Sequence, residues 1–279
     1  MLSNYWDYYK WIKPYRAVSV LFLLFQTPLA IPCEQNLSTL ELDAIAQRIY
    51  LNECNGQSAC LVDWNPGETF PSLGIGHFIW YPARIDPGYV ESFPLLVDYI
   101  RRRSIALPRW LAQLDPLDAP WSDRASFMKQ RHHTNVEQLR SFLLQNQTVQ
   151  IEFMQQRMQQ SLDKIIARTE AAKRNQVRKN IELLCASVQG QYALTDYVNF
   201  KGEGLAKQER TNGVGWGLMQ VLSGMPLSQS ATDAVTHFSE SAVVVLTHRA
   251  TNATNPLELT QWLPGWRKRI QTYSTFSAP

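Results

Sequence analysis

The sequence has no large surplus of charge and no long apolar segment, and each absence excludes a class of protein. Its 27 basic and 24 acidic residues leave a net charge of +3, which is too small to indicate a nucleic-acid partner. The apolar run at residues 17–25 is well short of the ~20 residues that a membrane-spanning helix needs. No internal repeat or low-complexity stretch stands out. We therefore expect one large globular domain, or two lobes that share a cleft, with no stable membrane span beyond an N-terminal anchor.

The four cysteines lack the spacing of a zinc site. No pair has CxxC spacing and no histidine lies close to them in the sequence, so we expect no metal ion, and nothing in the sequence indicates a cofactor. In an exported chain, an even number of cysteines permits disulfides without fixing how they pair. Cys54 and Cys60 are the pair we expect, because a bridge between them would fix the loop directly after Glu53.

The N-terminus has the pattern of an export signal. The apolar run at residues 17–25 follows three basic residues and is itself followed by a small residue, Ala30 (the basic residues are Lys10, Lys13 and Arg16). This order is typical of a secretory signal peptide. We expect residues 1–30 to be a signal peptide cleaved near Ala30, or an uncleaved anchor, and the chain to be exported to the periplasm or cell envelope.

Helical periodicity dominates the rest of the chain. A helix is predicted from Ser38, which forms a capping-box pattern with Glu41, to about Glu53. An irregular stretch with a short β-hairpin follows, and residues 122–188 are almost purely helical by their apolar spacing. In the last third, helices alternate with glycine-rich joints. The pattern predicts a mainly α fold with a small β-hairpin, which is an α+β class.

The hairpin carries an unusual motif, "SLGIGH" at residues 72–77. A helix that ends in a glutamate, a hairpin with this motif, a helical body and a late basic helix resemble the phage-type lysozymes. Two later stretches, "LTDYVNFKGEG" and "LPGWRKRIQTY", resemble that family's cleft-facing segment and closing helix. The resemblance implies a lysozyme-like fold over residues 31–279 with two lobes around a cleft. Residues 31–82 would form the helix and hairpin lobe, 83–188 a helical insertion, and 189–279 the C-terminal lobe.

The resemblance also implies the catalytic residues. The general acid would be the helix-end glutamate, Glu53, and Ser72 would take the place of a threonine. No position aligns cleanly with the second acid of the family, so Asp63 and Glu68 are both candidates. We favour Glu68, because it lies nearer the hairpin and follows a glycine. The residues expected to bind substrate are Gly74, Gly76, His77, Trp80, Tyr81, Asn199, Glu203 and Gln220.

A second motif favours a different glutamate. "GWGLMQVL" at residues 215–222 resembles the Gly-Leu-Met-Gln segment of lytic transglycosylases and goose-type lysozymes. In those enzymes a single catalytic glutamate, followed by serine, precedes this segment. Here Glu203 and Glu209 precede it and neither is followed by serine, so we favour Glu53.

Glycoside cleavage needs a protonated acid beside the leaving oxygen and a second group that stabilises or attacks the anomeric carbon. We expect apolar side chains to surround Glu53 and keep it protonated near neutral pH. These side chains are Tyr50, Leu51, Trp64, Phe70 and Trp80. Phe78, Trp80 and Tyr81 are expected to stack on sugar rings. The predicted function is a peptidoglycan-cleaving glycosidase, a lysozyme- or muramidase-like hydrolase whose partners are glycan strands. The alternatives are a lytic transglycosylase, a catalytically silent glycan-binding protein, or a helical scaffold.

Overall fold

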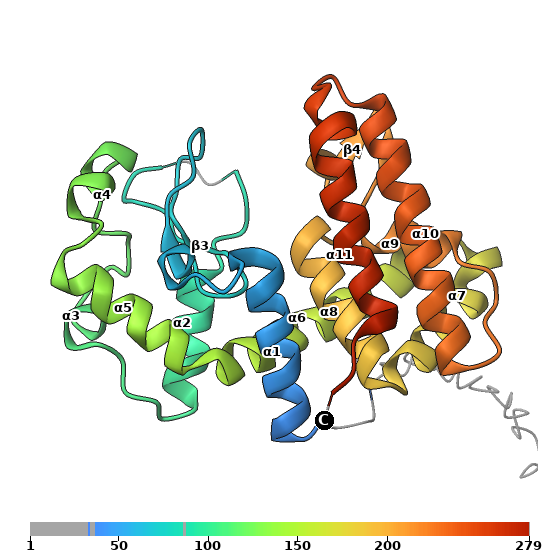
Figure 1. Cartoon of the computed structure of the whole chain (residues 1–279), viewed down its shortest axis with the longest axis horizontal. Helices are drawn as coiled ribbons and strands as arrows, with labels where there is room; N and C mark the ends of the chain where they lie inside the picture. Colours follow the sequence, from blue (N-terminus) through green and yellow to red (C-terminus); the bar gives the residue numbers. More distant parts are fainter. Residues whose placement is uncertain (1–32, 34–36, 86–87, 279) are drawn as a thin grey trace, which may run out of the picture. The chain divides into compact units, whose positions relative to one another are not determined.

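The computed structural model describes residues 33, 37–85 and 88–278 of the chain. The predicted signal peptide or anchor at residues 1–30 lies outside the described residues. Within them, the fold consists of eleven α-helices and two small antiparallel sheets of short strands (Figure 1). The predicted fold class, mainly α with a small β element, is confirmed; its lysozyme-like character stays a prediction. None of the helices in this part of the chain is long and apolar enough to cross a bilayer.

The first helix, α1 (Thr39–Cys54), begins where the sequence predicts. The Ser38 side chain accepts a hydrogen bond from the Glu41 backbone and the Glu41 carboxylate accepts one from the Ser38 backbone, so the predicted capping box is confirmed. After α1 come the 3₁₀ turn η1 (Ser58–Leu61) and three strands in one antiparallel sheet of order β1-β2-β3. The strands are β1 (Val62–Asp63), β2 (Ser72–Leu73) and β3 (Phe78–Ile79).

The remaining elements are helical apart from one small hairpin. They are α2 (Phe93–Arg102), α3 (Arg109–Ala112), α4 (Arg124–Gln130), α5 (Thr134–Gln145), α6 (Gln147–Arg168), α7 (Ala171–Cys185), α8 (Val188–Lys201), η2 (Lys207–Glu209), β4 (Arg210–Thr211), β5 (Val214–Gly215), α9 (Leu218–Gly224), α10 (Ala231–Asn252), η3 (Glu258–Trp262) and α11 (Leu263–Thr275). Helix α6 packs against α1 and α8, and α10 lies along α11 (Figure 1).

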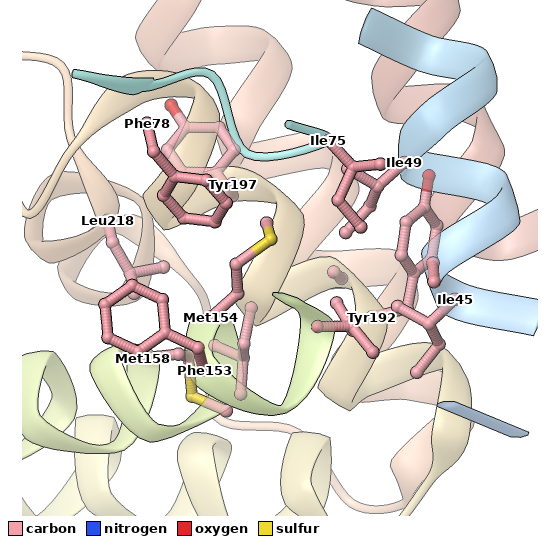
Figure 2. Close-up of a cluster of buried hydrophobic side chains, with 14 of the residues drawn as sticks. Ile45, Ile49, Ile75, Phe78, Phe153, Met154, Met158, Tyr192, Tyr197 and Leu218 are labelled. Atoms are coloured by element: carbon pink, nitrogen blue, oxygen red, sulfur yellow. The ribbon is translucent and has the colours of Figure 1, made fainter. Parts of the chain in front are cut away.

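The core around α6 holds the hairpin and the helices together. Met154 and Met158 of α6 are buried with Phe78 of β3 and with Tyr192 and Tyr197 of α8 (Figure 2). The apolar stripe predicted on α6 is therefore a core-facing stripe, as its helical spacing indicates. Because one helix contacts both the hairpin and α8, it fixes their positions relative to each other.

The glycine-rich turn between β2 and β3 is tied to α6 by a buried amide. The Ile75 backbone N–H donates to Oε1 of Gln150, at 2.9 Å. Gly74 has a φ of +69°, and a β-carbon there would collide with the same Gln150 oxygen. Glycine is therefore favoured at Gly74 both by the left-handed backbone and by the close approach of the Gln150 side chain.

Both pairs of cysteines in the described residues form disulfides. The predicted Cys54–Cys60 bridge is confirmed, and a second bridge joins Cys33 to Cys185 at the end of α7. Disulfides persist in oxidising environments, so the two bridges are typical of a secreted protein or of an oxidising compartment.

We expect all four cysteines to resist alkylation until the protein is reduced. Iodoacetamide treatment in denaturant without reductant, followed by peptide mass spectrometry, should leave every cysteine unlabelled. The same treatment after reduction should label all four. A labelled Cys54 or Cys60 in the unreduced sample would contradict the short bridge, and a labelled Cys33 or Cys185 would contradict the long one.

Candidate functional site

A groove of about 1120 Å³ runs across the faces of several elements. Its lining comes from the β2–β3 turn and β3, from α2, from α6, and from the end of α8 with the segment that continues to η2. Four of the predicted substrate-binding residues line it together: Gly76, His77, Asn199 and Glu203. These residues are far apart in the sequence, so the groove joins the hairpin motif to the "NFKGEG" stretch. A groove of this size accommodates an extended ligand.

Glu53 lies in the last turn of α1 and contacts Arg269 and His77. Its Oε1 accepts a hydrogen bond from Nη2 of Arg269 at 2.6 Å, and its Oε2 lies 3.5 Å from Nδ1 of His77. The side chain of Glu53 is 12% exposed and that of His77 is 34% exposed. Since His77 also lines the groove, it links the glutamate to the place where a ligand would bind.

Arg269 is shared between two carboxylates. From α11 it donates two hydrogen bonds of 2.8 Å to Asp196, which is fully buried in α8. The Tyr273 hydroxyl donates a further bond of 2.8 Å to the same carboxylate, and Nδ2 of Asn52 lies 3.4 Å from it. The cluster therefore ties the end of α1, the middle of α8 and α11 together at the position of Glu53.

The prediction that apolar side chains keep Glu53 protonated is wrong, because charged groups surround its carboxylate. Burial raises the pKa of Glu53, but the positive charges of Arg269 and His77 and the hydrogen bond from Arg269 lower that pKa more, so the net shift is downward. Glu53 is therefore a carboxylate at neutral pH.

Glu68 has the opposite electrostatic environment. Burial raises the pKa of its carboxyl group and the nearby charge of Asp63 adds to this, while a hydrogen bond from Asn65 and the charge of His77 oppose it; the net shift is upward. His77 thus acts electrostatically on both Glu53 and Glu68. Glu68 is half-buried but does not line the groove.

The structure corrects several other predictions, because the side chains are buried away from the groove. Trp80 is fully buried, packs on Phe93, and donates its indole N–H to the Leu117 carbonyl, so it cannot stack on a sugar. Tyr81 is 5% exposed and packs on the ring of Phe70. Other predicted site residues are buried and absent from the groove lining as well, namely Ser72 in β2 and Gly74, together with the predicted stacking ring of Phe78.

The "NFKGEG" stretch and the "GWGLMQ" segment, which resemble different lysozyme-like families, are hydrogen-bonded to each other. The Leu218 N–H donates to the Gly202 carbonyl, and the Gln220 amide accepts from the Gly217 N–H and donates to the Gly204 carbonyl. Gln220 therefore fastens "GWGLMQ" to "NFKGEG" and does not line the groove, contrary to the prediction that it binds substrate. Glu203 does line it.

The carboxylate of Glu203 is occupied by partners from α6. It accepts hydrogen bonds from Oγ of Ser161 at 2.7 Å and from Nζ of Lys164 at 2.8 Å. Glu203 is therefore paired with a cation, as Glu53 is with Arg269.

Sequence reasoning missed a buried lysine next to the Glu53 cluster. Nζ of Lys201 lies 3.6 Å from the ring centre of Trp266 and 3.9 Å from that of Phe200. Burial, followed by the positive charges of Arg249 and Arg269, lowers the pKa of Lys201 to about 6. The only sequence signal was a lysine between an aromatic residue and glycine in "NFKGEG".

Comparisons with protein-family models, with curated proteins and with solved structures give no match. A function for this chain therefore has to be argued from the groove and the charged residues at its edge.

Proposed function

We propose that this chain is a peptidoglycan-cleaving glycosidase in which Glu53 is the general acid, acting in the periplasm or cell envelope. The observation that supports this best is the position of Glu53. It contacts His77, which lines a long groove together with Asn199 and Glu203 from a distant part of the sequence. Glu53 itself is not among the residues that line the groove, but a carboxylate with a shifted pKa in contact with a groove-lining residue is a candidate for catalysis.

The proposal requires Glu53 to gain a proton when substrate binds. Arg269 and His77 hold it ionised in the structure. A glycan strand that covers His77 would exclude water from the groove, and loss of solvent favours the neutral carboxylic acid. The protonated Glu53 then donates to the glycosidic oxygen, and Glu68 is the candidate for activating the attacking water.

Two alternatives each have one observation in their favour. Glu203 lines the groove directly, which Glu53 does not, and this favours a transglycosylase with a single glutamate. The ionised state of Glu53 favours a catalytically silent protein that binds glycan without cutting it.

Incubation of the purified protein with peptidoglycan sacculi separates these functions. For a glycosidase, mass analysis should find soluble muropeptides that accumulate with time. A protein that sediments with sacculi but releases nothing would be a silent binder, and one that does neither would be inconsistent with any peptidoglycan function.

Glu68→Gln should change the products released from sacculi. If Glu68 activates water, the variant should lose hydrated products by at least ~100-fold, the lower range for acid–base catalysis. If the chain is a transglycosylase, anhydro products should persist unchanged. Asp63→Asn is the matched control, since Asp63 was the other candidate; mass spectrometry of the muropeptide ends distinguishes the two products. A greater loss in Asp63→Asn than in Glu68→Gln would reassign the second acid.

A further inference from the structure

One cluster of metal-ligating side chains in the described residues lies at the end of α1. Sγ of Cys54, Sγ of Cys60 and a ring nitrogen of His77 are all within 4.8 Å of one another. His77 was too distant in the sequence to be counted with the cysteines, but the hairpin returns it to them. In the oxidised protein the two sulfurs are bonded to each other and cannot act as thiolate ligands.

We propose that reduction of the Cys54–Cys60 bridge creates a binding site for a thiophilic divalent cation such as Zn²⁺, with Cys54, Cys60 and His77 as ligands. This proposal does not rest on the proposed glycosidase function, although His77 belongs to both sites. The reduced protein would bind a metal ion next to the groove, and the oxidised protein would not.

The geometry around Cys60 already suits zinc. Its sulfur lies 3.5 Å from Nε2 of His77. In a tetrahedral site with Zn–S bonds of about 2.3 Å and Zn–N bonds of about 2.0 Å, a sulfur and a nitrogen ligand lie roughly 3.5 Å apart. Two sulfur ligands of zinc would lie roughly 3.8 Å apart. The two sulfurs are 2.04 Å apart in the disulfide, so after reduction a movement of the Cys54 side chain is enough to reach that separation.

The other nitrogen of His77 has a suitable partner. Nδ1 lies 3.5 Å from the Glu53 carboxylate, so a proton on Nδ1 leaves the lone pair of Nε2 directed to the cysteine side. Ligating histidines usually donate their second N–H to a carboxylate or carbonyl, which fixes the ring and increases its basicity. His77 also has a φ of +47°, an uncommon conformation for a residue with a side chain and one that concentrates at functional positions.

The metal has a route to the site, and the bridge can be reduced selectively. His77 lines the groove. Cys60 is half-buried, whereas the other three cysteines are buried. A short loop gains little stability from its cross-link, whereas the bridge between Cys33 and Cys185 spans 152 residues. We therefore expect the short bridge to be reduced first.

The chemistry balances with a dithiol as reductant. Two electrons and two protons pass from the dithiol, which becomes a disulfide, to the Cys54–Cys60 bond, which becomes two thiols. Binding of the divalent cation then replaces the two thiol protons, which leave to solvent, and the oxidation state of the metal does not change. Water from the groove would fill the fourth position of the metal.

Titration of the full chain with Co²⁺, used as a spectroscopic probe without oxygen, tests the site. In a Cys33→Ser/Cys185→Ser background that keeps only the short bridge, the reduced protein should bind one Co²⁺ and show thiolate-to-cobalt and tetrahedral d–d absorption. The oxidised protein should show neither. The matched Cys54→Ser/Cys60→Ser background, which keeps the long bridge, should not show them when reduced.

His77→Gln should weaken cobalt binding by at least ~100-fold, since loss of an outer-shell partner alone costs 10–100-fold. His132→Gln, which removes an exposed histidine, is the control and should leave the affinity unchanged. If the double-serine background does not fold, the same comparison is made in the reduced wild-type chain. Equal affinity in His77→Gln and wild type, absence of thiolate absorption, or loss of circular dichroism on reduction would each overturn the proposal.

Discussion

Glu53→Gln should lower the release of muropeptides from sacculi by at least ~100-fold, the lower range for loss of a general acid. The amide retains the size of the side chain and an oxygen that accepts from Arg269, but it has no proton to transfer. Initial rates of muropeptide release, measured by chromatography and mass analysis at equal protein concentration, give the ratio.

Two further variants make this result specific. Glu240→Gln removes an exposed carboxylate on α10 and should leave the rate unchanged. Glu203→Gln should lose less activity than Glu53→Gln, because in the proposed mechanism Glu203 lines the groove without transferring a proton. If Glu203→Gln abolishes release and Glu53→Gln does not, Glu203 is the catalytic glutamate and the transglycosylase alternative takes precedence.

Acid titration of stability provides a readout of the Glu53 variant that does not depend on activity. The pKa of Glu53 is lowered in the folded protein from its usual 4.5, so its carboxylate stabilises the fold above that pH. This stabilisation is lost as the pH falls through the lowered pKa. Glu53→Gln has no such proton uptake, and its unfolding free energy should therefore vary less between pH 5 and pH 3 than that of the wild type.

The features that the sequence predicted correctly are those set by neighbouring residues. The capping box joins Ser38 to Glu41, and the short bridge joins cysteines six positions apart, so both depend on local geometry. The apolar stripe of α6 follows from helical periodicity alone. Mainly helical content with a small sheet was predictable for the same reason.

The surroundings of Glu53 were not predictable, because they come from distant segments. Arg269 lies 216 residues from Glu53 in the sequence, and nothing near either residue indicates the pair. The aromatic residues of the hairpin show a related limit. Trp80 and Tyr81 have the composition of a sugar-binding surface. In the fold, Phe93 of α2 and Trp110 pack on Trp80, and Phe70 packs on Tyr81. Composition alone does not distinguish a stacking face from a core.

Arg269→Met should destabilise the folded protein by about 3–5 kcal/mol, the range for removal of one partner of a buried ion pair. The side chain of Arg269 is 9% exposed and that of Asp196 is fully buried, so the variant leaves the Asp196 carboxylate without its cation in a place that water does not reach. It also removes the charge that most lowers the pKa of Glu53. Urea denaturation followed by circular dichroism gives the change in unfolding free energy.

Arg267→Met is the matched control, since Arg267 lies two residues earlier on α11, is exposed, and donates a hydrogen bond to the Thr247 hydroxyl, at 3.1 Å. This variant should change the unfolding free energy by no more than about 0.5 kcal/mol, as for most surface changes.

Adding Asp196→Asn to Arg269→Met should recover part of the lost unfolding free energy, because a neutral amide can still accept from Tyr273 and costs less to bury than a carboxylate. If Arg269→Met costs no more than Arg267→Met, or if Asp196→Asn adds to the loss instead of reducing it, then Arg269 does not hold the ends of α1, α8 and α11 together through its charge, and the ionised state of Glu53 needs another explanation.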